Sequence, residues 1–400
     1  MCVRFPAFAL LEHVVSSLKV GRRRELGMNV VRCPSCGGRM KRNGTTSAGS
    51  TRWRCKACGA SLVDRIDNSA KRLGEFLGWL LSKERQADMP GGGRTFRRRT
   101  QEFWRVWPLP PVTGEVCRVV FVDGIYLSRR ACVLIARSEE HVLGWYVARS
   151  ENSAAYRALM ARIAPPEVGV TDGGSGVGKA RRGLWPETRV QRCTFHAFEQ
   201  VKRYTTTRPR TQAGVDLYAL AKELLRIGTS GKAAAWLADY ARWCSDYDDF
   251  LREETTGDDG RAFLTHERLV KARNSLTALV RSGQLFTYVD PGLVERLGPL
   301  PATNNAVEST NAQLRAMLRE HRGLSLERRI KAVYWWCYTH TECPMSAAEI
   351  LRAMPTDEDI AKEMRAMSYE DRASLGPRRW GDGLVWEELH RSTPWRRDWD

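Results

Sequence analysis

The chain has 400 residues, 42% of them hydrophobic, and its formal net charge is +18 at pH 7. This length is enough for two to four domains with sizeable cores, and the charge favours a polyanionic partner such as nucleic acid. No apolar run reaches about 18 residues without a charge, which argues against a membrane-spanning helix. The first 20 residues lack a basic start followed by a small-residue cleavage site, so we expect no signal peptide.

The positive charge is concentrated near the N-terminus. Residues 1–112 hold 22 Lys or Arg and 8 Asp or Glu, so they carry +14 of the +18. Such a concentration indicates a dedicated nucleic-acid-binding module, although a merely solvated basic surface is the alternative. Because Met28 immediately precedes the first recognisable motif, we expect residues 1–27 to be an extension with little function.

Four cysteines have the spacing of a zinc site. Cys33 and Cys36 form one Cys-x2-Cys pair, and Cys55 and Cys58 form a second pair eighteen residues further on. Each pair presents two thiolates to one ion, and four thiolates hold one structural Zn²⁺ tetrahedrally. A redox dithiol is the alternative, but it needs a βαβ context that this segment lacks. We therefore predict a zinc ribbon over residues 28–63 and, because its cysteines stay reduced, a cytoplasmic protein.

Residues 64–112 have the pattern of a helix-turn-helix domain. Apolar residues recur at helical spacing over 73–81, which predicts a first helix, and the glycine-rich segment 89–93 ends it. A second helix is predicted over 95–106, and its outer face is rich in arginine and includes Thr100. A plain helical linker with a solvated basic face is the alternative. The residues of these two modules that we expect to contact DNA are Arg39, Lys41, Arg42, Arg97, Arg98 and Arg99.

After prolines 108, 110 and 111 the pattern changes to strands. Three apolar runs separated by polar turns predict an antiparallel meander, and a helix, a strand, a glycine-rich loop, a strand and a helix follow. This order is that of an RNase H-like domain, a mixed α/β fold in which the first and fourth strands lie side by side. The predicted elements are strands at 116–125, 131–137, 141–148, 168–171 and 189–194, and helices at 153–163 and 195–204.

One aspartate follows the apolar run of the first predicted strand, and another follows the apolar run of the fourth. Asp123 follows Val119–Val122, and Asp172 follows residues 168–171. A carboxylate at the end of a buried strand must stay solvated or paired, and it suits Mg²⁺, which takes one or two carboxylates. Glu308 is a third candidate, on a helix predicted over 304–319 that could aim it at the aspartates. We expect these acids to hold two Mg²⁺ or Mn²⁺ ions.

The glycine-rich segment 173–180 also fits G-x4-G-K, the phosphate-binding loop of nucleotide-binding proteins. Such a loop needs Ser or Thr after the lysine to bind Mg²⁺, and Ala180 has no hydroxyl. We therefore expect a flexible loop that brings Lys179 close to DNA phosphates, rather than a nucleotide site.

Four motifs in order resemble the Mutator-like class of bacterial insertion-sequence transposases. They are VDGIYL at 122–127, VTDG at 170–173, RCTFH at 192–196 and TNNAVESTN at 303–311. The resemblance implies an RNase H-like catalytic domain of the DDE type, with Asp123, Asp172 and Glu308 as catalytic metal ligands. It also implies a Cys-x2-His motif after the second aspartate, which Cys193 and His196 match, and a helical insertion before the final acid.

The resemblance implies a function as well. A transposase of this class binds the terminal inverted repeats of its element, cleaves DNA with Mg²⁺ and joins the freed 3′ end to target DNA. We therefore expect double-stranded DNA as partner, no membrane, and a homodimer on DNA in the bacterial cytoplasm, associated with the nucleoid. A nuclease or resolvase of the same fold without strand transfer, and a DNA-binding regulator with an inactive catalytic domain, stay open as alternatives.

The roles of Cys193 and His196 are also open. They could form half of a zinc site, position the fold, or, in the case of His196, assist the transition state.

The expected fold class is thus multidomain α+β. Its expected segments are an N-terminal extension (1–27), a zinc ribbon (28–63), a helix-turn-helix (64–112), the first part of the catalytic domain (113–205), an all-α insertion (206–300), the last part of the catalytic domain (301–345) and a C-terminal tail without an assigned role (346–400).

Overall fold

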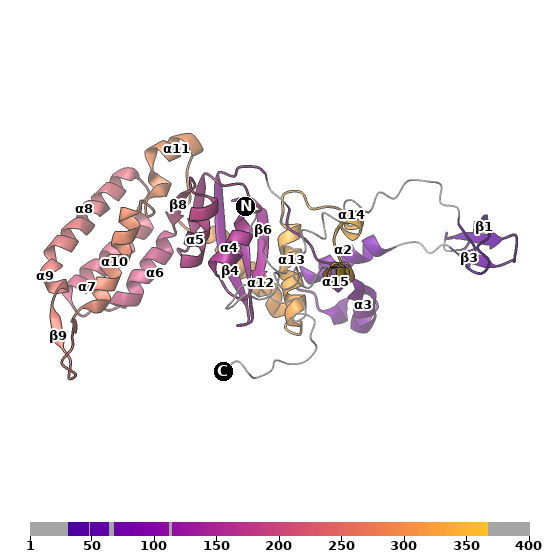
Figure 1. Cartoon of the computed structure of the whole chain (residues 1–400), viewed down its shortest axis with the longest axis horizontal. Helices are drawn as coiled ribbons and strands as arrows, with labels where there is room; N and C mark the ends of the chain where they lie inside the picture. The colour runs from indigo at the N-terminus through magenta and orange to yellow at the C-terminus, as the bar shows by residue number, and fades with distance from the viewer. Residues whose placement is uncertain (1–30, 48, 64–67, 112–113, 367–400) are drawn as a thin grey trace. The chain divides into compact units, whose positions relative to one another are not determined.

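The computed structural model describes residues 31–47, 49–63, 68–111 and 114–366 (Figure 1). The expected extension at 1–27 and the tail from 367 onward lie outside the described residues. Those that are described belong to two compact units, one over 109–344 and the other formed by the residues before 109 and from 345 onward. Within the described ranges, no helix has both the length and the apolar character needed to cross a membrane.

The cysteine-rich segment folds as a small antiparallel sheet in the order β1-β2-β3. Its buried core consists of Cys33, Met40 and Cys55. A core of this size supplies little folding energy, so a bound metal would have to stabilise the module. The strands are β1 (Met40–Thr45), β2 (Thr51–Cys55) and β3 (Ser61–Val63).

The helical part of the same unit packs around aromatic rings. Phe76 contacts the rings of Trp79, Phe103 and Trp104. The expectation that Thr100 faces outward is wrong: its side chain is 2% exposed, because it lies one turn after buried Phe96 and donates its hydroxyl to the Phe96 carbonyl. The elements are α2 (Ser69–Leu80), η1 (Gln86–Asp88), α3 (Gly92–Thr100) and η2 (Gln101–Arg105).

Part of the segment without an assigned role belongs to this helical unit. Helix α14 (Ala347–Ala353) packs against α2, and α15 (Asp357–Ala366) follows it. The Trp107 indole donates a hydrogen bond to the Asp357 carboxylate at 2.6 Å, and Trp107 is fully buried. A helix distant in sequence therefore completes the packing of α2, and whether this unit acts as a helix-turn-helix stays a prediction.

The other unit is built on a five-stranded mixed sheet in the order β6-β5-β4-β7-β8. The first three strands form the predicted antiparallel meander, and β4, β7 and β8 are parallel. The strands are β4 (Val119–Leu127), β5 (Ala131–Arg137), β6 (Val142–Ala148), β7 (Val168–Thr171) and β8 (Arg189–Arg192).

Helices cover both faces of this sheet, as Figure 1 shows. Helices α4 (Ser153–Met160) and α5 (Ser175–Leu184) pack on one face. On the other lie α6 (Thr194–Thr205), α12 (Asn305–Glu320) and α13 (Leu326–Thr339).

The expected flexible loop at 173–180 is wrong. Gly173, with φ of 84°, makes the turn after β7, and helix α5 begins two residues later. The helix forms because Val177 and Ala180 fall on one side of it and are buried against the sheet. Lys179 is on the exposed side of the same helix.

Between α6 and α12 the chain forms a helical insertion, but the all-α expectation is wrong. It contains the antiparallel hairpin β9 (Glu254–Thr256) and β10 (Ala262–Leu264), with Gly260 at φ of 76° in its turn. The hairpin is mostly exposed and therefore lacks the alternating apolar pattern that identifies a strand. The helices are α7 (Gln212–Glu223), η3 (Leu224–Arg226), α8 (Ser230–Asp246), α9 (Asp248–Leu251), α10 (Glu267–Arg281), η4 (Thr287–Val289) and α11 (Pro291–Leu297).

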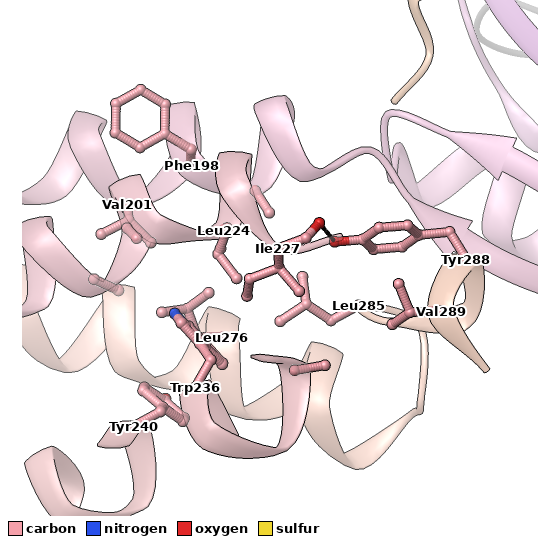
Figure 2. Close-up of a cluster of buried hydrophobic side chains, with 14 of the residues drawn as sticks. Phe198, Val201, Leu224, Ile227, Trp236, Tyr240, Leu276, Leu285, Tyr288 and Val289 are labelled. Carbon is pink, nitrogen blue, oxygen red and sulfur yellow. Dashed lines mark hydrogen bonds between the residues drawn. The ribbon is translucent and has the colours of Figure 1, made fainter. Parts of the chain in front are cut away.

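The core of the insertion is continuous with the core under the sheet. One buried cluster runs from Phe121 and Val170 on the strands, through α6, to Trp236 and Leu276 in the insertion. Figure 2 shows its centre, where the Tyr288 hydroxyl donates to the Ile227 carbonyl at 2.8 Å. Because the apolar side chains are shared, the insertion is anchored to the sheet and is not a separate appendage.

Leu276→Ala should test this shared core. Leu276 is 0% exposed, so its truncation should lower the free energy of unfolding by about 2–5 kcal/mol. The matched control is Leu225→Ala in the same insertion, where the side chain is 43% exposed and the change should stay below about 0.5 kcal/mol. Equal changes for the two variants, measured by denaturant unfolding, would contradict the packing described.

Candidate functional site

Asp123 is in the middle of β4 and not at its end, and Asp172 directly follows β7, the neighbouring parallel strand. The parallel register of β4 and β7 pairs Val122 with Thr171, so Asp123 and Asp172 are the next residues on each strand. Adjacent strands lie about 4.8 Å apart, and residues at equivalent positions point to the same face. Asp123 and Asp172 therefore lie near each other at the carboxyl end of β7, and the charge of Asp172 acts on Asp123.

Helix α12 brings the third acid towards this edge. Glu308 is in its first turn, and Asn311, almost one turn later, is 1% exposed. The Asn311 amide donates to the Asp123 carboxylate at 2.8 Å and to the Gly124 carbonyl at 3.4 Å. These bonds attach α12 to β4 next to Asp123.

The environment of Asp123 disfavours its charged form. Burial raises the pKa of the carboxyl group to about 6, and the charges of Asp172, Glu151 and Glu308 act in the same direction, against a hydrogen bond from the Gly124 backbone. A carboxylate in such surroundings gains from a bound cation, which would relieve both the burial and the repulsion.

The three acids do not, however, have metal-ligand spacing. Among the described residues, two groups have donor atoms that all lie within 4.8 Å of one another. One is the four cysteines and the other is Cys193, His196 and Glu308. Glu308 is thus grouped with His196 and Cys193, and not with the two aspartates.

Glu151 is a fourth acid that the sequence-based prediction missed. It precedes α4, and its carboxylate accepts a hydrogen bond from the Tyr156 hydroxyl at 2.8 Å. Burial raises its pKa, and the charge of Asp172 adds to this. The overlooked signal is its position just after β6, which runs parallel to β4 and therefore ends at the same edge of the sheet.

Arg192 is a buried cation beside these acids. It ends β8, and its guanidinium donates to the Gln200 side chain at 3.3 Å, while Nη1 has no hydrogen-bond partner among the described residues. Burial lowers the pKa of Arg192, and the charge of Asp172 opposes this. Gly173 leaves the space that the guanidinium fills, because a side chain there would overlap it.

Cys193 and His196 lie at the start of α6, beside Glu308. His196 Nδ1 is 3.5 Å from Glu308 Oε1, and the backbone N–H of Asn304 donates to the Cys193 sulfur at 3.3 Å. The hydrogen bond with Cys193 raises the pKa of His196, and the charges of Cys193, Glu308 and Asp172 add to it, against burial. Burial raises the pKa of Cys193, but its bonds with His196 and the backbone outweigh burial and the net shift is downward.

The four ribbon cysteines form a cluster that could hold a structural zinc ion. Cys33 and Cys58 have sulfurs 3.5 Å apart, as do Cys36 and Cys55. Zinc–sulfur bonds of about 2.3 Å in a tetrahedron separate the sulfurs by roughly 3.8 Å. A backbone hydrogen bond near Ser35 lowers the pKa of Cys33 to about 6, against burial, which favours the thiolate form that binds metal.

Most of the predicted DNA-contacting residues are exposed. Arg99 differs, because its guanidinium is 2.8 Å from the Glu75 carboxylate and both side chains are half-buried. The exposed residues are Arg39, Lys41, Arg42, Arg97, Arg98 and Lys179.

No protein-family model matches the chain, and a search of curated proteins likewise gave no match.

The pH dependence of stability should test the environment of Asp123. Its folded-state pKa is above the ordinary value of 3.8, so the folded protein binds this proton more tightly than the unfolded chain does. The Asp123 contribution to the free energy of unfolding therefore falls as pH rises from about 4 to about 6, by an amount on the order of 3 kcal/mol. Without divalent metal, Asp123→Asn should be more stable than wild type at pH 8 and lose that advantage at pH 4. Denaturant unfolding that shows no pH-dependent difference would contradict this.

Gly124→Ala should test the close approach of Glu151. A Cβ atom at Gly124 would lie 2.6 Å from Glu151 Oε1 and 2.8 Å from the Cys132 sulfur. We expect thermal unfolding to reveal a loss of about 1–3 kcal/mol, part of which Glu151→Ala in the same chain recovers. Gly231→Ala is the control, because nothing lies within 4 Å of the added atom. Unchanged stability in Gly124→Ala would show that the carboxylate is not held there.

Proposed function

We propose that the protein is a DDE-type DNA transposase of the Mutator-like class, which cleaves DNA at the ends of its element and joins them to target DNA. The observation that carries the proposal is the convergence at one sheet edge. Asp123 and Asp172 stand on adjacent parallel strands, and Asn311 attaches the helix that bears Glu308 to the first of them. The resemblance to these transposases implies that these three acids meet at one metal centre.

The topology of the sheet supports the catalytic fold. Counted along the chain, the strands lie in the order third, second, first, fourth, fifth, with the first three antiparallel and the last two parallel to the first. An RNase H-like domain has this order. Ligands of such open sheets bind outside the carboxyl ends of parallel strands. Asp172 directly follows the carboxyl end of β7, and Asp123 is on the neighbouring strand β4.

The residues at this edge suit Mg²⁺ or Mn²⁺, because they offer carboxylate oxygens in a partly solvated setting. Asp123 and Asp172 would hold the ions, with Glu308 as the third acid. Two bound ions supply an activated nucleophile and stabilise the leaving 3′ oxygen of an in-line displacement at phosphorus. Glu151 extends the negative charge of the edge, and the charge of Arg192 partly balances it.

The cysteine-rich module suits DNA binding. Its strands set Lys41 directly opposite Arg54. Contact with Lys56 lowers the pKa of Lys41, and the positive charges of Lys56 and Arg39 add to this. Like charges at opposed strand positions repel, so a phosphate backbone bound there would relieve the repulsion. Arg97 and Arg98, both exposed on α3, supply a second basic surface.

Transposition acts on paired DNA ends, so we propose a homodimer on double-stranded DNA in the bacterial cytoplasm, associated with the nucleoid. A single structural zinc ion in the ribbon belongs to the same proposal.

The experiment uses full-length protein, Mg²⁺, and DNA that bears the inverted repeats flanking the gene. Asp123→Ala, Asp172→Ala and Glu308→Ala should each reduce cleavage and joining by on the order of a hundredfold or more while DNA binding persists. Glu187→Gln, which changes an exposed acid of the same unit, should leave all three activities unchanged.

The outcomes separate the alternatives. Metal-dependent cleavage followed by joining supports a transposase. Cleavage without joining would instead indicate a nuclease or resolvase, and binding without cleavage a DNA-binding regulator; either result overturns the proposal. Full activity of one acid variant would remove that residue from the site.

A further inference from the structure

Cys193, His196 and Glu308 form a second group of potential metal ligands, apart from the cysteine-rich module. Their donor atoms all lie within 4.8 Å of one another. A thiolate and an imidazole are ligands of zinc and other soft divalent ions, whereas Mg²⁺ takes oxygen ligands. The Mg²⁺ chemistry proposed above therefore does not explain why a sulfur and a nitrogen accompany Glu308.

The spacing of these atoms suits a tetrahedral ion. Zinc–nitrogen and zinc–oxygen bonds of about 2.1 Å at a tetrahedral angle separate the two donors by roughly 3.4 Å. His196 Nδ1 and Glu308 Oε1 are 3.5 Å apart. Three protein ligands with one open position are the usual set of a catalytic zinc site, while a structural site has four.

The surrounding backbone holds these ligands in place. Cys193 is 0% exposed, and its N–H donates to the Thr171 carbonyl at the end of β7. The next residue, Thr194, donates its backbone N–H to the carbonyl of Ala302, just before α12. The start of α6 is thus attached both to the sheet and to the segment that leads to Glu308.

Several polar atoms at this place are buried without a hydrogen-bond partner. Among the described residues, neither polar side-chain atom of Asn304 has one, and His196 Nδ1 and Glu308 Oε1 face each other at 3.5 Å. Asn304 is fully buried, and its backbone N–H contacts the Cys193 sulfur. Buried polar atoms are rarely left unpaired, so this group is short of a ligand.

We propose that Cys193, His196 and Glu308 bind a zinc ion, with the fourth position open to water. The ion joins the start of α6 to the first turn of α12 and so sets the position of Glu308. Binding releases protons from the ligands, because zinc takes the deprotonated thiol and the neutral imidazole. The site does not depend on the DNA chemistry proposed above, and zinc content can be measured without any DNA substrate.

The first test is the zinc content of the full chain, purified under reducing conditions and measured by mass spectrometry of the elements. Wild type should hold two zinc ions per chain, one in each group of ligands. Cys55→Ser with Cys58→Ser should remove the first ion and keep the second. The second ion should be lost, and the ribbon ion kept, in each of three variants: Cys193→Ser, His196→Ala and Glu308→Gln. The control is Cys117→Ser, a half-buried thiol outside both groups, and this variant should keep both zinc ions.

The second test replaces zinc with Co²⁺ and records the sulfur-to-cobalt absorption in the near ultraviolet. The Cys55→Ser, Cys58→Ser chain should keep a band from the single thiolate of Cys193, and adding Cys193→Ser should abolish it. Circular dichroism verifies that each variant is folded. If Cys193→Ser does not fold, the loss of the second zinc ion is tested with His196→Ala and Glu308→Gln instead.

One zinc ion per wild-type chain, or no cobalt band in the chain that lacks the ribbon thiols, would overturn the proposal. Either result would leave the proposed transposase activity untouched. Conversely, two zinc ions in a chain that does not cleave DNA would support this site and contradict only the proposed function.

Discussion

The partly buried hydrogen bond from Asn311 to Asp123 is the contact on which the site depends. It joins positions 188 residues apart at 2.8 Å, and its acceptor is a carboxylate whose pKa burial raises. A hydrogen bond to a buried charged group contributes more than one between neutral groups. Because Asn311 lies less than one turn after Glu308, this bond also decides which acid of α12 faces the sheet.

The insertion makes that contact possible. Nearly a hundred residues separate α6 from α12, yet both helices start beside the end of β7, and one apolar core runs from the strands through the insertion to Val307. A loop of this length without a core would lose more conformational entropy on ordering than one hydrogen bond could offset. The buried side chains of the insertion supply that compensation, so its packing and the position of Glu308 are physically linked.

Local patterns predicted the parts of the fold that local physics determines. The strands around Asp123 and Asp172 are apolar runs bounded by turns, and their adjacency followed from the order of the elements. The helix beginning after Gly173 was missed because glycines that suggest a loop were outweighed by two side chains buried against the sheet. Glu151 was missed because only the paired strands show that it lies at the same edge as Asp172.

The direct measurement is anomalous X-ray diffraction from crystals of the full-length protein soaked with Mn²⁺. If the acids form the proposed catalytic centre, manganese should lie between the carboxylates of Asp123 and Asp172, with a Glu308 oxygen turned towards it. The soak uses Mn²⁺ concentrations that support the activity of known Mn²⁺ enzymes. If manganese then binds elsewhere and both aspartates are free of metal, this result would contradict the proposal that these carboxylates form a metal-dependent active site.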